Sequence, residues 1–186
     1  MKKMILVLCA VLALGCCTAF AEAANKVVLW ENTATEVDEA GNLLEQPVKV
    51  TLETAEPVEI EMIDEVDVSD GFFAKIRRDG VAPVVVSITP ADYGAHANLN
   101  KATEEQLQAF IAKVAEQFEE GKYVSEIKKT ESGNTFLAVG DAVTRSVWTI
   151  YEDTLIEIIQ YKEDFTELTA EDQAFAVEIL QGIWME

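Results

Sequence analysis

Strict alternation of apolar and polar residues is the most regular pattern in the first third of the chain. It covers residues 48–53 and 58–62, where the apolar positions are Val48, Val50, Leu52, Val58, Ile60 and Met62. A period of two is typical of strands that turn one face to a core and the other to solvent. Pro57 has no backbone N–H, so it belongs at a strand start or a sheet edge. The pattern predicts an antiparallel sheet with one charged, solvated face.

A hairpin is predicted in the next segment. Residues 72–77 and 82–89 are two apolar runs, and Arg78-Asp79-Gly80 between them is a turn sequence. The run Val84-Val85-Val86 is continuous rather than alternating, which favours a central strand covered on both faces.

Four more strands are predicted between Tyr123 and Tyr161. They span residues 123–130, 135–139, 143–151 and 155–161, with turn residues at Glu131–Asn134 and Tyr151–Thr154. Short strands joined by tight turns indicate an antiparallel meander.

Two helices interrupt and close this series of strands. The first begins at Thr103, where Gln106 three residues later completes a capping box, and ends at Gly121. The second begins at Thr169, with Asp172 in the same relation, and extends to Trp184. Their apolar stripes are Leu107, Phe110, Ile111, Val114 and Phe118, and Phe175, Ala176, Ile179, Leu180 and Ile183. The sequence therefore predicts an α+β fold, with two principal helices packed on an antiparallel sheet in one domain, residues 47–186.

The first 21 residues have the features of a secretory signal peptide. Lys2 and Lys3 precede an apolar core, residues 4–14, and Ala19-Phe20-Ala21 is a small-x-small cleavage site. The alternative is a lipoprotein signal, because Ala13-Leu14-Gly15 precedes Cys16; leucine would be usual at position 13. Either signal predicts an exported protein, periplasmic or extracellular.

Cysteine chemistry is excluded by the same cleavage. All three cysteines lie in the leader, so a chain cut after Ala21 has no thiol, no disulfide and no thiolate metal site; they are Cys9, Cys16 and Cys17.

Residues 22–46 are expected to form an N-terminal arm or hairpin. Val27-Val28-Leu29-Trp30 predicts a short first strand, and residues 31–46 are mostly polar. Of the three tryptophans, Trp30 is the one most expected to be exposed, although burial in the core is favoured over an interface role even there. Trp148 is expected to pack in the core or on the sheet, and Trp184 is expected to cover the core edge.

Charge narrows the class of partner. The formal net charge is −20, and loss of Lys2 and Lys3 would make it −22. Nucleic acids and anionic lipids need basic patches that displace counterions, so they are not expected as partners. A basic or cationic protein partner is electrostatically favoured, although solubility alone also explains an acidic surface.

No catalytic motif is present. The single histidine, His96, lies in the polar loop Tyr93 to Asn98, and no serine occupies a Gly-x-Ser-x-Gly elbow. One histidine does not make a transition-metal site. The sequence predicts neither a cofactor nor catalytic or metal-binding residues.

One acidic loop leaves Ca²⁺ binding open as an alternative function. Its carboxylates are Asp64, Glu65, Asp67 and Asp70. Valines occupy two ligand positions of an EF-hand alignment that ends at Gly71, so that loop type is excluded, but a looser Ca²⁺ site is not.

The order of the expected elements from Val48 to Trp184 resembles the PsbP-like fold of photosystem extrinsic subunits and a Ran-binding import factor. The resemblance also rests on the predicted hairpin at Tyr151-Glu152-Asp153-Thr154-Leu155 and on the C-terminal helix that contains Ile179-Leu180-Gln181-Gly182-Ile183. That resemblance implies a scaffold used for protein binding or assembly, without catalytic residues.

The expected function is therefore that of a non-enzymatic accessory factor of the cell envelope. Its expected interface is the charged sheet face together with residues 31–46. A small-ligand or Ca²⁺ binding module, at residues 64–71 and 93–98, is the alternative, and a hydrolase is a third hypothesis.

Overall fold

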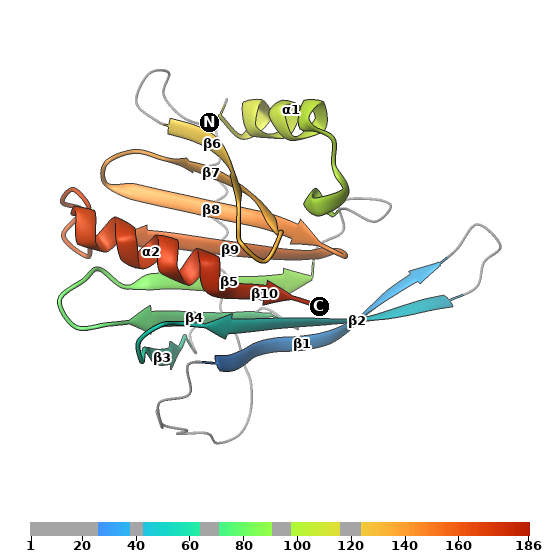
Figure 1. The fold of residues 1–186 in the computed structure, drawn as a ribbon, viewed down its shortest axis with the longest axis horizontal. Helices are drawn as coiled ribbons and strands as arrows, with labels where there is room; N and C mark the ends of the chain where they lie inside the picture. Colours follow the sequence, from blue (N-terminus) through green and yellow to red (C-terminus); the bar gives the residue numbers. More distant parts are fainter. Residues whose placement is uncertain (1–25, 38–42, 64–70, 91–97, 116–123) are drawn as a thin grey trace, which may run out of the picture.

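Ten strands in two antiparallel sheets and two α-helices make up the part of the chain that the computed structural model describes (Figure 1). This part comprises residues 26–37, 43–63, 71–90, 98–115 and 124–186. The predicted class, α+β with two helices packed on antiparallel sheet, is confirmed.

The smaller sheet joins the two ends of the described chain. Its strand order is β1-β2-β10, and the strands are β1 (Lys26–Val37), β2 (Leu43–Glu53) and β10 (Ile183–Met185). β10 pairs with the inner half of β2, so that Ile183 lies opposite Leu52. Backbone hydrogen bonds between Lys49 and Glu186 extend this pairing to the last residue.

The larger sheet has seven strands in the order β3-β4-β5-β9-β8-β7-β6. They are β3 (Glu59–Met62), β4 (Phe72–Arg77), β5 (Val84–Pro90), β6 (Val124–Lys129), β7 (Thr135–Gly140), β8 (Thr144–Tyr151) and β9 (Thr154–Tyr161). The predicted hairpins β4–β5, β6–β7 and β8–β9 are all formed, and β5 lies inside the sheet as its continuous valine run indicated.

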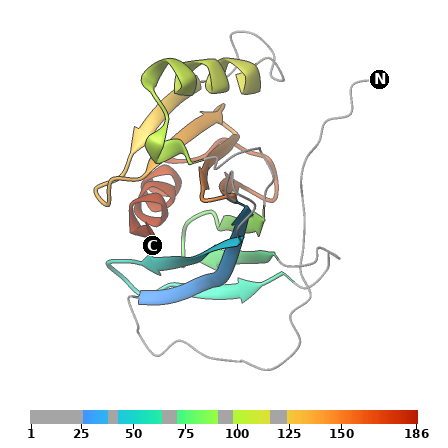
Figure 2. The same cartoon turned by 90° about the vertical axis from the view of Figure 1, so that its right-hand side faces the viewer.

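Each face of the larger sheet has its own apolar cluster. On one face, α2 (Ala170–Gly182) and the smaller sheet pack over β5, β7 and β9 through side chains such as Val50, Phe136, Ile158 and Ile179. On the other, α1 (Glu104–Ala115) and the short 3-10 helix η1 (Leu99–Lys101) cover β7 and β8. Figure 2 shows the two helices apart from each other, with α1 at the top of the view and α2 lower, next to the C-terminus.

Both predicted capping boxes are formed. The backbone N–H of Thr103 donates to Gln106 Oε1 at 2.8 Å, and the N–H of Gln106 donates to Thr103 Oγ1 at 3.3 Å. Thr169 and Asp172 make the same reciprocal pair at the start of α2. The predicted end of the first helix, residues 116–121, lies outside the described residues.

Two details of the predicted fold are wrong. Residues 48–53 and 58–62 were expected in one sheet, but β2 and β3 belong to different sheets. The closing helix ends at Gly182 rather than Trp184, and the chain continues as β10. Gly182 lies so close to the Glu53 carbonyl oxygen that a Cβ atom at this position would overlap it, so the absence of a side chain allows the change from helix to strand.

The N-terminal segment is a long hairpin. The β1–β2 register runs from Lys26↔Glu53 to Val37↔Leu43, and the outer half projects from the body at the right of Figure 1. β2 crosses position 46, where the arm was expected to end, and its inner half enters the core.

Trp184, rather than Trp30, is the exposed tryptophan. Trp30 is half-buried against the core, whereas Trp184 on β10 is 41% exposed. Within the described residues, no helix combines the length and the apolar character that a bilayer-spanning helix requires.

Candidate functional site

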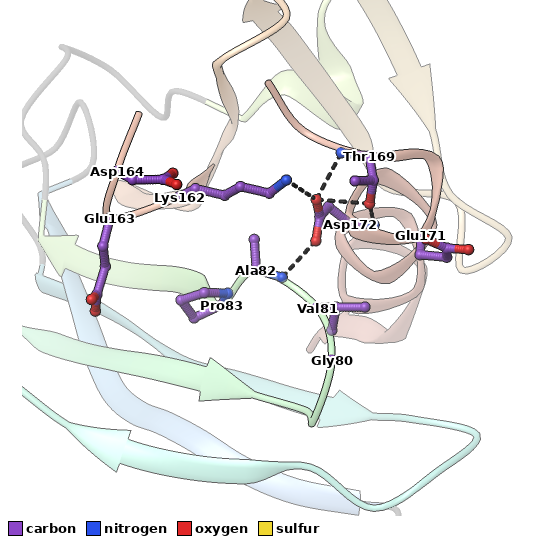
Figure 3. A pocket seen from close by; sticks show the side chains of 10 residues that line it. All are labelled: Gly80, Val81, Ala82, Pro83, Lys162, Glu163, Asp164, Thr169, Glu171 and Asp172. Carbon is purple, nitrogen blue, oxygen red and sulfur yellow. Dashed lines mark hydrogen bonds and ion pairs between the residues drawn. The ribbon is translucent and has the colours of Figure 1, made fainter. Parts of the chain in front are cut away.

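An open groove of about 580 Å³ lies between the β4–β5 connection and the loop from β9 to α2 (Figure 3). Its lining residues come from these two segments and the first turn of α2: Gly80, Val81, Ala82, Pro83, Lys162, Glu163, Asp164, Thr169, Glu171 and Asp172. The β5–β9 pairing brings the two segments together, because Val84 and Gln160 lie opposite each other.

Asp172 forms the base of the groove and is only 2% exposed. Its Oδ1 accepts the backbone N–H of Ala82 at 2.6 Å. Its Oδ2 accepts the N–H and the hydroxyl of Thr169 at 2.7 and 2.8 Å, and lies 3.2 Å from Lys162 Nζ. One carboxylate therefore joins β5, the end of β9 and the start of α2.

These contacts keep Asp172 ionised. Burial alone would raise its pKa, but the hydrogen bonds from Ala82, Thr169 and Lys162 outweigh burial and hold the pKa well below its ordinary value. A negative charge in the first turn of α2 is also favoured by the helix dipole.

A buried glutamine also connects β5, β9 and the start of α2. Gln160 is 1% exposed, and its Nε2 donates to the carbonyl oxygens of Ala82 and Asp172 at 3.1 and 2.7 Å. Its Oε1 has no hydrogen-bond partner among the described residues.

The rim of the groove is acidic. The lining carries four carboxylates and one ammonium group, a formal balance of −3. That ammonium group, on Lys162, is engaged by Asp172 and by the carbonyl oxygen of Glu167 at 2.8 Å. Glu163, Asp164 and Glu171 are exposed, so their field extends into solvent.

A second depression of about 490 Å³ adjoins the groove and shares Gly80, Val81 and Pro83 with it. It contains two arginines, both neutralised. Arg77 Nε lies 2.7 Å from Glu61, and Arg78 makes a bidentate pair with Glu178, at 2.6 and 2.7 Å.

The Arg78–Glu178 pair is a structural connection. The Arg78 guanidinium also lies over the Phe175 ring at 4.7 Å, and Glu178 accepts the N–H of Ala55 at 3.2 Å. The hydrogen bonds from Arg78 lower the pKa of Glu178. The pair ties the β4–β5 turn and the β2–β3 connection to α2, so it is not free to bind a ligand.

The polar side chains of the groove are either paired with one another or separated. Its one hydroxyl, on Thr169, donates to Asp172 rather than facing a free base. Figure 3 shows the side chains of Glu163 and Glu171 pointing apart. No group of three or more potential metal ligands occurs in the part of the chain that the structure describes. What the groove can do is pair its separate carboxylates with cationic side chains.

Outside the groove, a half-buried acid, Glu157, lies on the sheet face that bears Trp148. Glu157 lies between Trp148 and Ser87 on the neighbouring strands and accepts the Ser146 hydroxyl at 2.9 Å. Burial raises its pKa, and the single hydrogen bond only partly offsets this.

Most of the sites suggested by the sequence lie outside the described residues. Residues 64–70 and 91–97, which include the acidic loop and His96, are outside the described residues, as are residues 38–42 of the expected arm. Asn98 is described: it is buried and donates to Glu152 at 2.6 Å, which is a structural role.

The groove itself was missed from the sequence. Asp172 was identified only as a helix cap and Arg78 only as a turn residue, and Lys162 and Glu178 were given no role. The capping box is the one local signal in this site; the partners of Asp172 and Arg78 are up to 100 residues distant in sequence.

Comparison of the chain with protein-family models, with curated proteins and with solved structures finds no significant match, so the PsbP-like resemblance stays a prediction.

Proposed function

We propose that the protein is an exported, non-enzymatic accessory factor that binds a basic protein partner through the acidic groove beside α2. The observation that carries the proposal is the −3 balance of the groove, whose single lysine is already paired with the buried Asp172. The three exposed carboxylates thus have no strong internal counter-ion, and a basic segment would supply one.

The charged face of the smaller sheet is a weaker candidate interface. Lys26 lies 3.7 Å from Glu53, and Glu31 lies opposite Lys49, so opposite charges alternate there. A locally balanced surface attracts a basic partner less than the groove does.

The proposal is tested by titrating the full chain with decalysine, a basic probe without other recognition features. We expect binding at about 0.05 M NaCl that is lost above about 0.3 M NaCl, because exposed charge contacts are screened at that ionic strength. Changing Glu163 and Glu171 together to Gln should weaken binding about three- to tenfold, since each removed contact contributes up to about 1 kcal/mol.

The matched control removes two charges elsewhere. Glu105 and Glu131 are exposed. Glu105 lies in the first turn of α1, and the N–H of Glu131 donates to Gln181, at the opposite end of α2 from the groove; their double change to Gln alters the net charge equally. If this control weakens binding as much as the groove variant does, the net charge and not the groove attracts the peptide, and the proposed site is wrong.

A further inference from the structure

An aromatic pair lies where β9 passes into the loop of the acidic rim: Tyr161, half-buried, ends β9, and Phe165 follows it in the loop. Phe165 is 68% exposed, the largest value among the large apolar side chains of the described residues. Its ring stacks on that of Tyr161, with centroids 6.0 Å apart and planes inclined by 10°. One face of Phe165 is thus supported, and most of the remaining ring surface meets water.

The backbone holds Phe165 in an unfavourable conformation. Its φ is +54°, a region that a bulky residue rarely adopts and where asparagine or glycine would be less strained. The N–H of Phe165 donates to the Lys162 carbonyl at 3.0 Å, and Asp164 accepts the N–H and the hydroxyl of Thr166 at 3.1 and 2.7 Å. The loop is therefore fixed by its own hydrogen bonds before any partner arrives.

Carboxylates flank Phe165 in the sequence of this loop. Glu163 and Asp164 precede Phe165 and Glu167 follows it, and all three are exposed. Lys75 lies 3.9 Å from Glu163, too far for a strong pair with a side chain that is 79% exposed. Hydrogen bonds from Thr166 lower the pKa of Asp164, so this carboxylate is charged at neutral pH.

We propose that the Tyr161–Phe165 pair is the binding site, here called the arginine seat or aromatic seat, for an arginine side chain of the basic partner. The guanidinium lies on the exposed face of Phe165, and the neighbouring carboxylates accept its N–H groups. This inference rests on the proposed function and specifies the chemistry that the loop recognises. An exposed ring alone would favour any apolar partner, but an exposed ring on a loop that also carries three exposed carboxylates favours a planar cation.

Arginine fits this surface better than lysine. The guanidinium is planar and weakly hydrated, so it stacks on an aromatic face and still donates N–H groups in its plane to carboxylates. The lysine ammonium group is a compact, strongly hydrated charge that gains less from the ring. Discrimination between the two cations therefore reports the aromatic seat separately from the acidic field.

The test compares decaarginine with decalysine, two peptides of equal length and charge, by calorimetric titration of the full chain in about 0.05 M NaCl. We expect decaarginine to bind about two- to fivefold more tightly, the range that cation–π contacts give at exposed sites. Phe165→Leu, which keeps an apolar side chain but no π-system, should abolish the preference while changing decalysine affinity less than about twofold.

Two controls keep the result interpretable. Phe165→Tyr restores an aromatic ring at the same backbone position and should restore the preference for arginine. A preference that persists in Phe165→Leu, or equal binding of both peptides by the unaltered protein, would overturn the arginine seat and leave the proposed function standing. Failure of both peptides to bind would overturn the two proposals together.

Discussion

Two carboxyl groups removed from solvent in this fold have pKa values shifted in opposite directions. Asp172 accepts three hydrogen bonds and an ion pair, whereas Glu157 accepts one hydroxyl. Burial raises the pKa of both groups, but only Asp172 has enough donors to reverse the effect, so its pKa is lowered and that of Glu157 is raised. The ionised form thus stabilises the fold at one position and destabilises it at the other.

We expect Asp172→Asn to lower the free energy of unfolding by about 2–4 kcal/mol at pH 7, because it removes charge-assisted hydrogen bonds and leaves Lys162 without its carboxylate. In a domain of this size the melting temperature should fall by roughly 5–15 °C. Since the folded-state pKa of Asp172 is depressed, its contribution is complete above the unfolded value and is lost as the pH falls toward the folded value. The deficit of the variant, measured by urea unfolding, should therefore shrink below about pH 4.

Glu157→Gln is the matched control for that experiment. Because the pKa of Glu157 is raised, the penalty it imposes is complete above the folded value and absent below the unfolded value. The amide can still accept the Ser146 hydroxyl, so the variant should be more stable at pH 7, with a gain that disappears at acidic pH. Destabilisation by both substitutions would mean that burial of Glu157 carries no penalty for its charge.

At the scale of single elements, local sequence signals determined what could be predicted. The capping boxes at Thr103 and Thr169 and the hairpin turns each involve a few consecutive residues, so their geometry follows from those residues alone. β10 was missed because Ile183 and Trp184 continue the helical spacing of Leu180; only Gly182 marked the change. An exposed tryptophan on that short strand was missed for the same reason.

The β8–β9 turn contains two residues with positive φ, Glu152 at +42° and Asp153 at +56°. A two-residue hairpin turn of this kind favours Asn-Gly. We expect Asp153→Gly to raise the melting temperature by roughly 1–4 °C, since relief of left-handed strain outweighs the added freedom of the unfolded chain. Differential scanning calorimetry measures this shift.

Glu152→Gly separates backbone strain from side-chain contacts in the same turn. It relieves the strain of a comparable positive φ, but it also removes the Glu152 carboxylate, which accepts hydrogen bonds from Asn98 and Lys101, both at 2.6 Å. Loss of those contacts should make this variant no more stable than the unaltered protein. A larger gain at Glu152 than at Asp153 would show that strain, not the contacts, dominates the turn.

At the scale of the whole molecule, the division into two sheets and the groove could not be predicted from local patterns. Alternation at residues 48–53 and 58–62 indicates which face of a strand is buried but not which strand is its neighbour. The groove depends on contacts such as that between Ala82 and Asp172, 90 residues apart. Such pairs carry no periodic signal, so the sequence predicted an acidic interface on the charged sheet face and residues 31–46 and gave no indication of the groove.

The net charge also determines how the melting temperature of the protein depends on salt. At −20, long-range repulsion opposes the compact state, whereas the exposed ion pairs of the described residues are local and individually weak. We expect the melting temperature at pH 7 to rise by several degrees between about 0.02 and 0.3 M NaCl, because screening reduces the repulsion more than it weakens the pairs. At pH 4.3, near the isoelectric point of the sequence, the repulsion is nearly absent and the same salt should have little effect. A melting temperature that falls with salt at pH 7 would instead mean that the ion pairs joining the sheets and α2, Arg78–Glu178 foremost, outweigh the repulsion.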